Sequence, residues 1–308
     1  MNSIMTLIKR NHCCKVLFIK NNYKNLIILF RKDFAVDFRK NLLLLKTSSI
    51  PTLLKTSSTF FCYSFFLKKN MATIVSALLT NINSHRNIET YIDYGKKLCN
   101  ININKVIFIE EHIYNTYFIN ENYPTTTFIF TSKEKLYLYQ YKADDLINFN
   151  KLCTDNPSKD TIEYMYVQCS KTEWVKEAIE KNPYNSEQFI WVDFGIYHMI
   201  NNEELFNKFI YELGNKSYEN IRIASGTYFN IQNVYTHIQW LFLGSIFGGH
   251  KDKLVEFADL MKQKCIDIIT NEKTIMWEIN IWSLIYLENP GLFDRYIANH
   301  DGSILRCY

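Results

Sequence analysis

From Met71 onward the sequence predicts an α/β domain with a mainly parallel sheet covered by helices on both faces. Short apolar, β-branched runs alternate with amphipathic segments at helical spacing, and neither an internal repeat nor a long linker interrupts them. Sheets of this kind bind ligands at the carboxyl ends of their strands. Chemistry is therefore expected just after Leu79, Ile109, Val192 and Phe247.

The strands are predicted from short buried runs, in which both faces of the chain are apolar. In order they are Thr73–Leu79, Lys105–Ile109, a segment containing Phe128–Phe130, Gln188–Val192, Ile221–Ala224 and Trp240–Phe247.

The helices are predicted from apolar residues spaced three and four apart and from residues that end a helix. In order they are Asn87–Leu98, Lys171–Lys181 before Asn182-Pro183, Glu203–Leu213 before Gly214, Lys251–Ile269, and Ile275–Leu287 before Asn289-Pro290.

The charge is divided unevenly along the chain. Residues 1–70 hold 13 Lys and Arg against 2 acidic residues, or +11, whereas the remainder holds 22 basic and 29 acidic residues, or −7. A nucleic-acid-binding main domain is disfavoured, because phosphate backbones require a basic surface. Only the N-terminal segment has the composition of a basic arm.

Residues 1–70 are expected to be a basic extension, disordered or outside the fold, and residues 71–308 a single domain. The apolar runs of the extension are too short to span a bilayer, and no signal-peptide cleavage pattern follows them. Its acid-poor composition is compatible with a transit-like sequence. Met71, which opens a good first strand, is favoured instead as the start of translation. The eight scattered Cys lack a CxxC pair, which predicts reduced thiols and a cytoplasmic location.

The strongest local feature is the segment from Phe189 to His198, FIWVDFGIYH, in which an apolar strand runs directly into Asp193. An Asp at a strand end can bind a divalent cation or a ribose hydroxyl. Gly195 then allows a ligand to approach closely, or a positive φ. The structural alternative is that Asp193 caps a turn that Gly195 shapes. His198 is more often a structural residue than a ligand.

Gly248 and Gly249 follow the strand at Phe247 and precede a helix, where paired glycines can admit a phosphate-bearing ligand. The alternative is a simple tight turn. No P-loop, dinucleotide fingerprint, GxSxG, HExxH or kinase signature is present, so those enzyme classes lose their usual support.

Three further sites carry candidate chemistry. Lys171, at a helix start, can supply a cation to a diphosphate, although a solvated lysine is the commoner explanation. Glu278, on an apolar helix, can act as a general base or bind sugar hydroxyls, or it can be a core residue bonded to the backbone. His300 and Asp301 can complete a metal or phosphate site, or form an ordinary Asp-Gly turn with Gly302.

In their order, several segments resemble the HtrL/YibB family of glycosyltransferase-like proteins, which also includes WlaTC-type members. The segments are TIVSALL, NIETYIDYGKKL, KVIFIEE, SKTEWVKEAIEKNPYNSEQFIWVDFGIYH, LFLGSIFGGHKDKLVEF and MWEINIWSLIYLENPGLFDRYIANHDGSIL. The resemblance covers Met71 to Tyr308 and none of residues 1–70. No single motif in it is specific.

This family resembles the GT-A class of nucleotide-sugar transferases. The resemblance implies a Rossmann-like sheet, a nucleotide-diphosphate sugar donor, a glycan or protein acceptor, and Mn²⁺ or Mg²⁺. It places Asp193 where GT-A enzymes keep their DxD aspartates, Glu278 at the acceptor side, and His300 as a late metal ligand. The loop after Leu79 would contact the nucleotide. Because this sequence has DFG rather than DxD, one of the two usual carboxylates is missing.

The resulting hypothesis is a glycosyltransferase that uses Glu278 and Asp193 in catalysis. Lys171, Asp193, Gly195, Gly248 and Gly249 would hold the donor, and Asp193 and His300 would hold the metal. A non-catalytic carbohydrate- or nucleotide-binding protein on the same fold is the alternative. A third reading is an interaction protein that uses its basic N-terminal arm on membranes or nucleic acid.

Overall fold

The computed structural model describes residues 71–80, 87–141, 159, 161–200, 202–226 and 230–308, and the strand backbone of residues 14–21 and 24–31. The chain divides into two compact units, Met1–Leu67 and Lys68–Tyr308. This division lies close to the predicted boundary at residue 70. Within its described residues the first unit forms an antiparallel pair of strands, β1 (Cys14–Asn21) and β2 (Lys24–Arg31), which the sequence analysis did not predict.

The second unit is an α/β domain around a seven-stranded sheet with the order β5-β4-β3-β6-β8-β7-β9. The strands are β3 (Thr73–Leu78), β4 (Lys105–Ile109), β5 (Thr126–Phe130), β6 (Gln188–Val192), β7 (Ile221–Ser225), β8 (Phe242–His250) and β9 (Phe293–Ile297). The described pairings are parallel except those of β8, which runs antiparallel to β6 and to β7.

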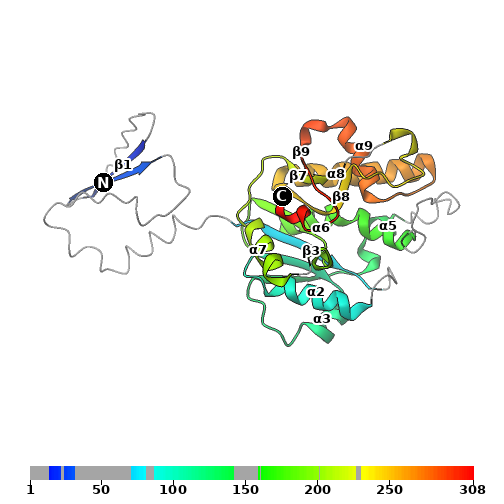
Figure 1. Ribbon diagram of the computed structural model, residues 1–308, viewed down its shortest axis with the longest axis horizontal. Coiled ribbons are helices and arrows are strands. Elements are labelled where there is room, and N and C mark those ends of the chain that lie inside the picture. The colour runs from blue at the N-terminus through cyan, green and yellow to red at the C-terminus, as the bar shows by residue number, and fades with distance from the viewer. Residues whose placement is uncertain are drawn as a thin grey trace. The chain divides into compact units, whose positions relative to one another are not determined.

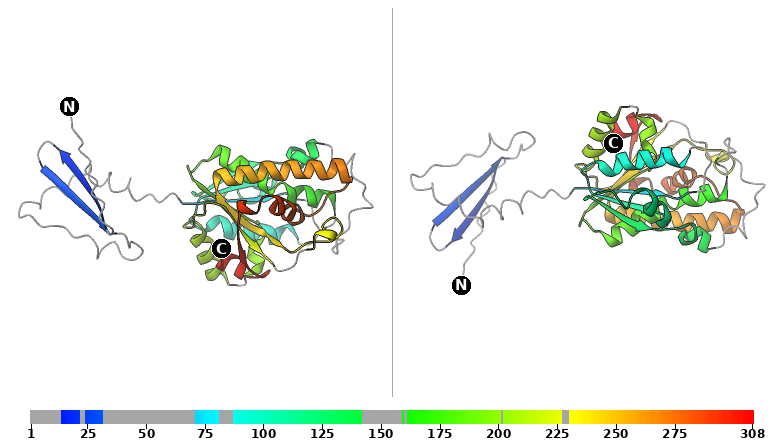
Figure 2. Two further views of the ribbon diagram at one scale, coloured as in Figure 1. Left: turned by 90° about the horizontal axis from the view of Figure 1, so that it is seen from above. Right: turned by 90° about the horizontal axis from the view of Figure 1, so that it is seen from below.

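Helices cover both faces of this sheet (Figure 1). The longer ones are α2 (Ile88–Asn100), α3 (Glu111–Tyr117), α5 (Ile162–Cys169), α6 (Lys171–Lys181), α7 (Glu203–Leu213), α8 (Lys251–Glu272) and α9 (Glu278–Glu288). The short helices α4 (Tyr137–Gln140) and α10 (Ser303–Arg306) complete the set among the described residues. Figure 2 shows α8 and α2 on opposite sides of the sheet. The predicted α/β class, with a mainly parallel sheet between two helical layers, is confirmed.

Two apolar cores lie on the two faces of the sheet, because successive strand residues point to opposite sides. Along β6, Phe189 and Trp191 belong to the core shared with α6, α8 and α9. Ile190 and Val192 belong to the core shared with α2, α3 and α7. All residues of β6 are buried, which is the strand type predicted from its uninterrupted apolar run.

The helix bounds follow the predicted signals with one informative exception. The helix α6 ends before Asn182, which takes a left-handed conformation, and α7 ends before Gly214, as predicted. The last long helix was predicted from Ile275, but α9 begins at Glu278. Glu278 therefore occupies the first turn of α9 rather than its interior.

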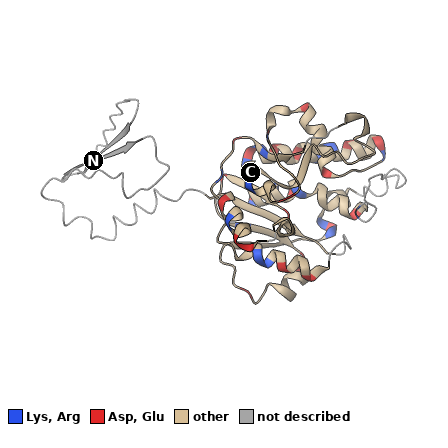
Figure 3. Ribbon diagram, in the orientation of Figure 1, with Lys and Arg blue, Asp and Glu red and all other residues tan. Residues whose placement is uncertain are grey.

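In the part of the chain that Figure 3 colours, charged residues lie mainly on the helices, with both signs interspersed, and few lie on the strands of the seven-stranded sheet. Lys105 is a charged residue within a strand, β4, and its side chain is fully buried. Its Nζ donates hydrogen bonds to the carbonyl oxygens of Ile101 (2.5 Å) and Ile103 (2.7 Å) and to Thr125 Oγ1 (3.2 Å). Burial lowers the pKa of Lys105 to about 8, because removal from water penalises the charged form.

Lys105 gives the domain a specific pH dependence of stability. Between about pH 8 and pH 10.5 the Lys105 side chain is protonated in the unfolded chain and neutral in the folded chain. Because the unfolded state binds more protons there, the free energy of unfolding rises as pH rises through that window. Relative to a Lys105→Met variant, the free energy of unfolding of the wild type should therefore rise by about 3 kcal/mol across it. Urea unfolding of both proteins at several pH values measures the difference, with the exposed Lys208→Met as the control. A difference that stays constant with pH would contradict the assignment.

Candidate functional site

A buried ion-pair cluster lies where β6, β8, α6 and α9 meet. The ammonium of Lys171, 3% exposed, lies 3.0 Å from Asp193 Oδ1 and 3.0 Å from Glu278 Oε1. It also donates to the carbonyl oxygen of Gly244 at 3.0 Å. We call Lys171, Asp193 and Glu278 the charged triad.

The three N–H groups of Lys171 are all taken up by these acceptors, since an ammonium has three donors. The alternative that Lys171 is an ordinary solvated lysine is therefore wrong. A direct contact between Lys171 and a diphosphate does not fit this arrangement either, because it would require one of the buried bonds to break. Burial alone would lower the pKa of Lys171, but the carboxylates of Asp193 and Glu278 outweigh it and raise that pKa.

Asp193 stands directly after β6 and connects the triad to the surface, with its side chain 34% exposed. Its Oδ1 accepts a hydrogen bond from the indole Nε1 of Trp191 at 2.7 Å in addition to the Lys171 ion pair. Trp191 in turn stacks on Trp174, with ring centroids 5.9 Å apart and planes 7° apart. One carboxylate oxygen is thus fixed in position by two donors, while the carboxyl group as a whole still reaches the surface.

Glu278 is the buried carboxylate of the triad, and it lies directly after Trp277, the N-cap residue of α9. Its Oε1 accepts from Lys171, whereas Oε2 has no hydrogen-bond partner among the described residues. A buried carboxylate oxygen without a donor is costly, and such atoms in native proteins call for an explanation.

Gly244 in β8 makes room for this carboxylate. A Cβ atom at Gly244 would lie 2.3 Å from Glu278 Oε1, closer than real atoms approach. The absence of a side chain therefore allows Glu278 and Lys171 to meet at the backbone of β8.

A second polar contact lies at the same end of the sheet, after β3 and β4. Glu110, directly after β4, accepts hydrogen bonds at 2.6 Å from both the backbone N–H and the hydroxyl of Thr80, which follows β3. A pocket of about 490 Å³ lies at the ends of β4 and β5. Its lining consists of Glu110, Glu111, His112, Asn115, Phe130, Thr131, Ser132 and Lys135. The predicted nucleotide loop after Leu79 lies mostly in residues 81–86, outside the described residues.

Gly248 and Gly249 lie within β8 (Phe242–His250) and do not join this end of the sheet, so the predicted end of that strand at Phe247 is wrong. Because β8 is antiparallel, Val192 pairs with Ile246 while Gly248 pairs with Ile190, further from Asp193. The glycines serve close backbone packing instead: a Cβ at Gly248 would lie 2.5 Å from Phe189 O, and one at Gly249 would lie 2.4 Å from Asn220 O.

A matched pair of glycine variants separates these roles. Gly244→Ala should displace Glu278 and, through Lys171, also Asp193, and so weaken ligand binding, whereas Gly248→Ala should lower stability by roughly 1–3 kcal/mol through overpacking and leave the triad intact. Calorimetric titration with nucleotide diphosphates and thermal unfolding, applied to both variants, measure the two effects. If the folded Gly248→Ala protein loses as much ligand binding as Gly244→Ala does, Gly248 is part of the binding site and this assignment is wrong.

Gly195 and His198 form the turn after Asp193. Gly195 has φ −92°, so the positive φ that the sequence allowed is not used. The backbone N–H of Ile196 donates to Asp193 O, and His198 Nδ1 lies 2.5 Å from Gly195 O. A turn therefore follows Asp193, but the Asp193 side chain does not cap it, because its Oδ1 bonds to Lys171 and Trp191 instead.

His300 lies beside His198, with ring centroids 6.2 Å apart. Asp301, in the same segment, caps the next turn, since its Oδ1 accepts from Ser303 N at 2.7 Å. Within the described part of the chain, no group of three or more His, Cys, Asp or Glu side chains is arranged to hold a metal ion. The residues predicted as metal ligands, Asp193 and His300, therefore form no protein-only metal centre there.

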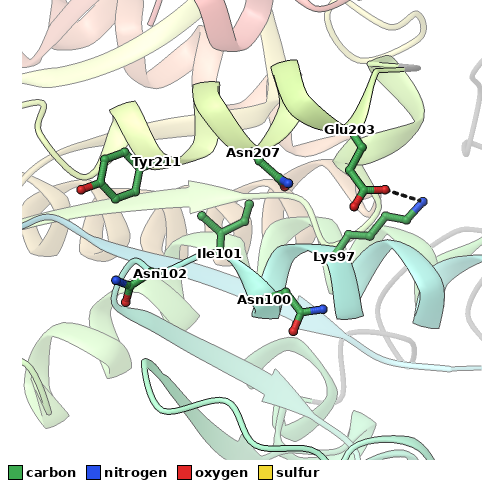
Figure 4. Close-up of a pocket in the computed structure, with 7 residues that line it drawn as sticks. All are labelled: Lys97, Asn100, Ile101, Asn102, Glu203, Asn207 and Tyr211. Atoms are coloured by element: carbon green, nitrogen blue, oxygen red, sulfur yellow. Dashed lines mark ion pairs between the residues drawn. The ribbon is translucent and has the colours of Figure 1, made fainter.

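A separate surface pocket of about 310 Å³ lies between the end of α2 and the helix α7 (Figure 4). Lys97 and Glu203 face one another across it at 3.7 Å. None of the residues predicted to carry function lines this pocket.

Sequence reasoning missed three contributors to the site, namely Gly244, Trp191 and Glu110. Trp191 and Glu110 each have a local signal, because they flank the predicted strand ends at Val192 and Ile109. Gly244 has none, since it matters only through Glu278, which lies 34 positions further along the chain.

No described helix is both long and apolar enough to cross a membrane. Among the described cysteines, Cys99, Cys169 and Cys265 are buried and Cys307 is exposed, and all four are free thiols.

Comparison with known proteins gives a family but no activity. No curated protein matches the chain significantly. Among solved structures, 4-diphosphocytidyl-2C-methyl-D-erythritol synthase from Anaerococcus prevotii DSM 20548 is similar at 8% identity and a TM-score of 0.36, over 74% of this chain and 86% of that one. Residues 73–308 match the family described as "Bacterial protein of unknown function (HtrL_YibB)". The expected resemblance is thereby confirmed, and the chain belongs to the HtrL_YibB family.

Proposed function

We propose that residues 71–308 form a glycosyltransferase that moves a sugar from a nucleotide-diphosphate donor to a hydroxyl of a glycan or protein acceptor. The observation that carries the proposal is the charged triad with the unpartnered, buried Oε2 of Glu278. Buried charges at the ligand-binding edge of an α/β sheet are typical of functional sites.

In the proposed reaction, the acceptor oxygen attacks the anomeric carbon of the donor sugar, and the bond from that carbon to the diphosphate oxygen breaks. The acceptor proton passes to Glu278 Oε2, and the nucleoside diphosphate leaves with the bonding electrons. Lys171 holds Glu278 and Asp193 in position, while Asp193 orients a donor hydroxyl.

The pocket at the ends of β4 and β5 suits the nucleotide part of the donor. Its volume of about 490 Å³ lies in the range of small-molecule sites. Phe130, 41% exposed, offers a ring for stacking, and Lys135 offers a cation for a phosphate.

A divalent cation would have Asp193 as its protein ligand here and would take its other ligands from the diphosphate and water, as Mg²⁺ often does. When bound, it would stabilise the negative charge on the leaving group. No step assigned to the side chains above depends on it.

Thermal unfolding of the full chain with UDP, GDP, CDP and ADP, each with and without Mn²⁺, tests donor binding. A ligand at about 100 times its Kd adds about 2.7 kcal/mol to stability and raises Tm. Release of the nucleoside diphosphate from the corresponding nucleotide sugars tests the chemistry. Absence of both a Tm shift and release across this panel would overturn the proposal.

A non-catalytic carbohydrate- or nucleotide-binding protein is the second candidate. It is favoured by Gly195, which stands where a second DxD carboxylate would be, and by the ion pair that occupies Asp193 Oδ1. Binding without release of the diphosphate, unchanged by Glu278→Gln, would support it.

A further inference from the structure

An aromatic surface lies on the segment from Asn230 to Leu241, just before β8. Trp240 and Tyr235 are 42% and 40% exposed. Trp240 contacts Trp277 edge-on, with ring centroids 6.4 Å apart, and Trp277 is itself only 7% exposed. The Trp240 ring is therefore held by Trp277 while much of its surface stays open to solvent, which leaves an aromatic face available for contact.

The segment is held in place from beneath by a buried amide. Asn280 Oδ1 accepts from Gln239 N at 2.8 Å, and Asn280 Nδ2 donates to Val234 O at 2.7 Å and to His237 O at 2.8 Å. The buried Gln239 accepts from Asn230 N at 2.6 Å and so ties the start of the segment to its end. These bonds fix the backbone that carries Trp240, and a pre-organised surface loses less entropy when a ligand binds.

The first turn of α9 contacts both this segment and the charged triad. Glu278 and Asn280, two residues apart at the start of α9, point in different directions, so one reaches Lys171 and the other reaches Gln239. Because β8 runs antiparallel, the chain before it continues past the end of β6. At about 3.3 Å per residue, Trp240 lies no more than about 13 Å along the chain from Gly244, which touches Glu278.

The residue types in the segment from Asn230 to Leu241 favour a neutral ligand over a charged one. The residues from Asn230 to Leu241 include amides, hydroxyls, a His and aromatic rings, and no Lys, Arg, Asp or Glu. A phosphate-bearing ligand would call for a cation, which the segment does not supply. A described cation near it, Lys159, lies 5.9 Å over the ring of Trp277. A neutral sugar, with an apolar C–H face and a rim of hydroxyls, matches an indole ring beside amides.

We propose that Trp240 is the platform of a subsite for a neutral sugar ring, the acceptor in the proposed transfer, with Asn280 as its positioning residue. The sugar stacks its C–H face on the exposed indole. The acceptor identity of the ligand rests on the proposed function, whereas binding of the sugar does not.

The test uses the full chain and the methyl glycosides of glucose, galactose and N-acetylglucosamine, without any donor. Saturation-transfer NMR and titration should show binding of at least one glycoside to the wild type. Trp240→Ala should weaken it about tenfold or more, and Trp240→Phe should retain most of it. Tyr211→Ala removes a comparably exposed ring, 48% exposed, on α7 and should leave binding unchanged.

Three results would overturn the subsite: no glycoside binds, Trp240→Ala binds as the wild type does, or Tyr211→Ala weakens binding equally. Circular dichroism and Tm identify any variant that fails to fold, and Trp240→Phe then decides the outcome. Nucleotide-sugar hydrolysis by the same proteins keeps the two proposals apart. If the protein hydrolyses a nucleotide sugar but binds no glycoside, only the subsite proposal is wrong. If it binds a glycoside but neither binds nor hydrolyses nucleotide sugars, only the proposed transferase function is wrong.

Discussion

Replacing Lys171 by methionine is expected to lower the free energy of unfolding by about 3–5 kcal/mol, because it leaves the buried Glu278 carboxylate without its cation. The loss is large compared with the 5–15 kcal/mol that stabilises a typical domain. It arises mainly from Glu278, since Asp193 can still reach solvent.

Urea unfolding of the full chain measures this loss, and Lys176→Met is the matched control. Lys176 lies on the same helix, α6, and pairs with Asp259 at 2.5 Å, but the two side chains are 26% and 59% exposed. Exposed pairs contribute about 0–1 kcal/mol, so the control should change little. If Lys171→Met does not fold, the double variant Lys171→Met/Glu278→Gln should recover part of the stability. A loss below about 1 kcal/mol in the single variant, or no recovery in the double, would show that the triad is not a buried charge network.

Changing Glu278 to glutamine is expected to lower the rate of sugar transfer by about 10²–10⁴-fold, the usual contribution of a general base. The amide matches the carboxylate in shape, and its oxygen can still accept from Lys171, so the fold and the binding of the nucleotide should persist. Initial rates of nucleoside diphosphate release, together with titration of the same diphosphate, separate the two effects.

Glu288→Gln provides the control for that measurement. Glu288 lies at the far end of the same helix, where it pairs with Lys264 at the surface. Its loss should leave the rate unchanged. Should Glu278→Gln retain the wild-type rate, Glu278 would be a structural core residue, and the general-base assignment would fail.

The elements that sequence reasoning predicted well are those whose pattern is strong over a short window. The strand β6 and the helices α6 and α7 have the predicted bounds, because apolar runs, Asn182 and Gly214 mark them locally. The helix α5 was missed although Ile162, Met165, Tyr166 and Cys169 are buried at helical spacing, so a signal was available. The strand β9 was missed because it has only two buried residues, Phe293 and Tyr296.

Within the site, Lys171, Asp193 and Glu278 were predicted as separate candidates, and the structure brings them together. Gly248 and Gly249 were predicted to share the edge with Asp193 and do not. The difference lies in strand direction, since apolar runs look alike whichever way a strand runs. A parallel β8 would have placed these glycines beside Asp193, whereas the antiparallel β8 brings Gly244 there instead.

The sequence by itself determined the class of the fold, most of the element bounds and the residue types able to carry chemistry, because local periodicity and helix-ending residues act over a few positions. Only the tertiary structure decided that Lys171 is enclosed by two carboxylates, one of them 107 positions away, and that Glu278 keeps an unpartnered oxygen. Contacts of that separation depend on the pairing and direction of the strands. The packing of the whole domain determines the pairing and direction of the strands, and no hydrophobic periodicity within a single segment reports them.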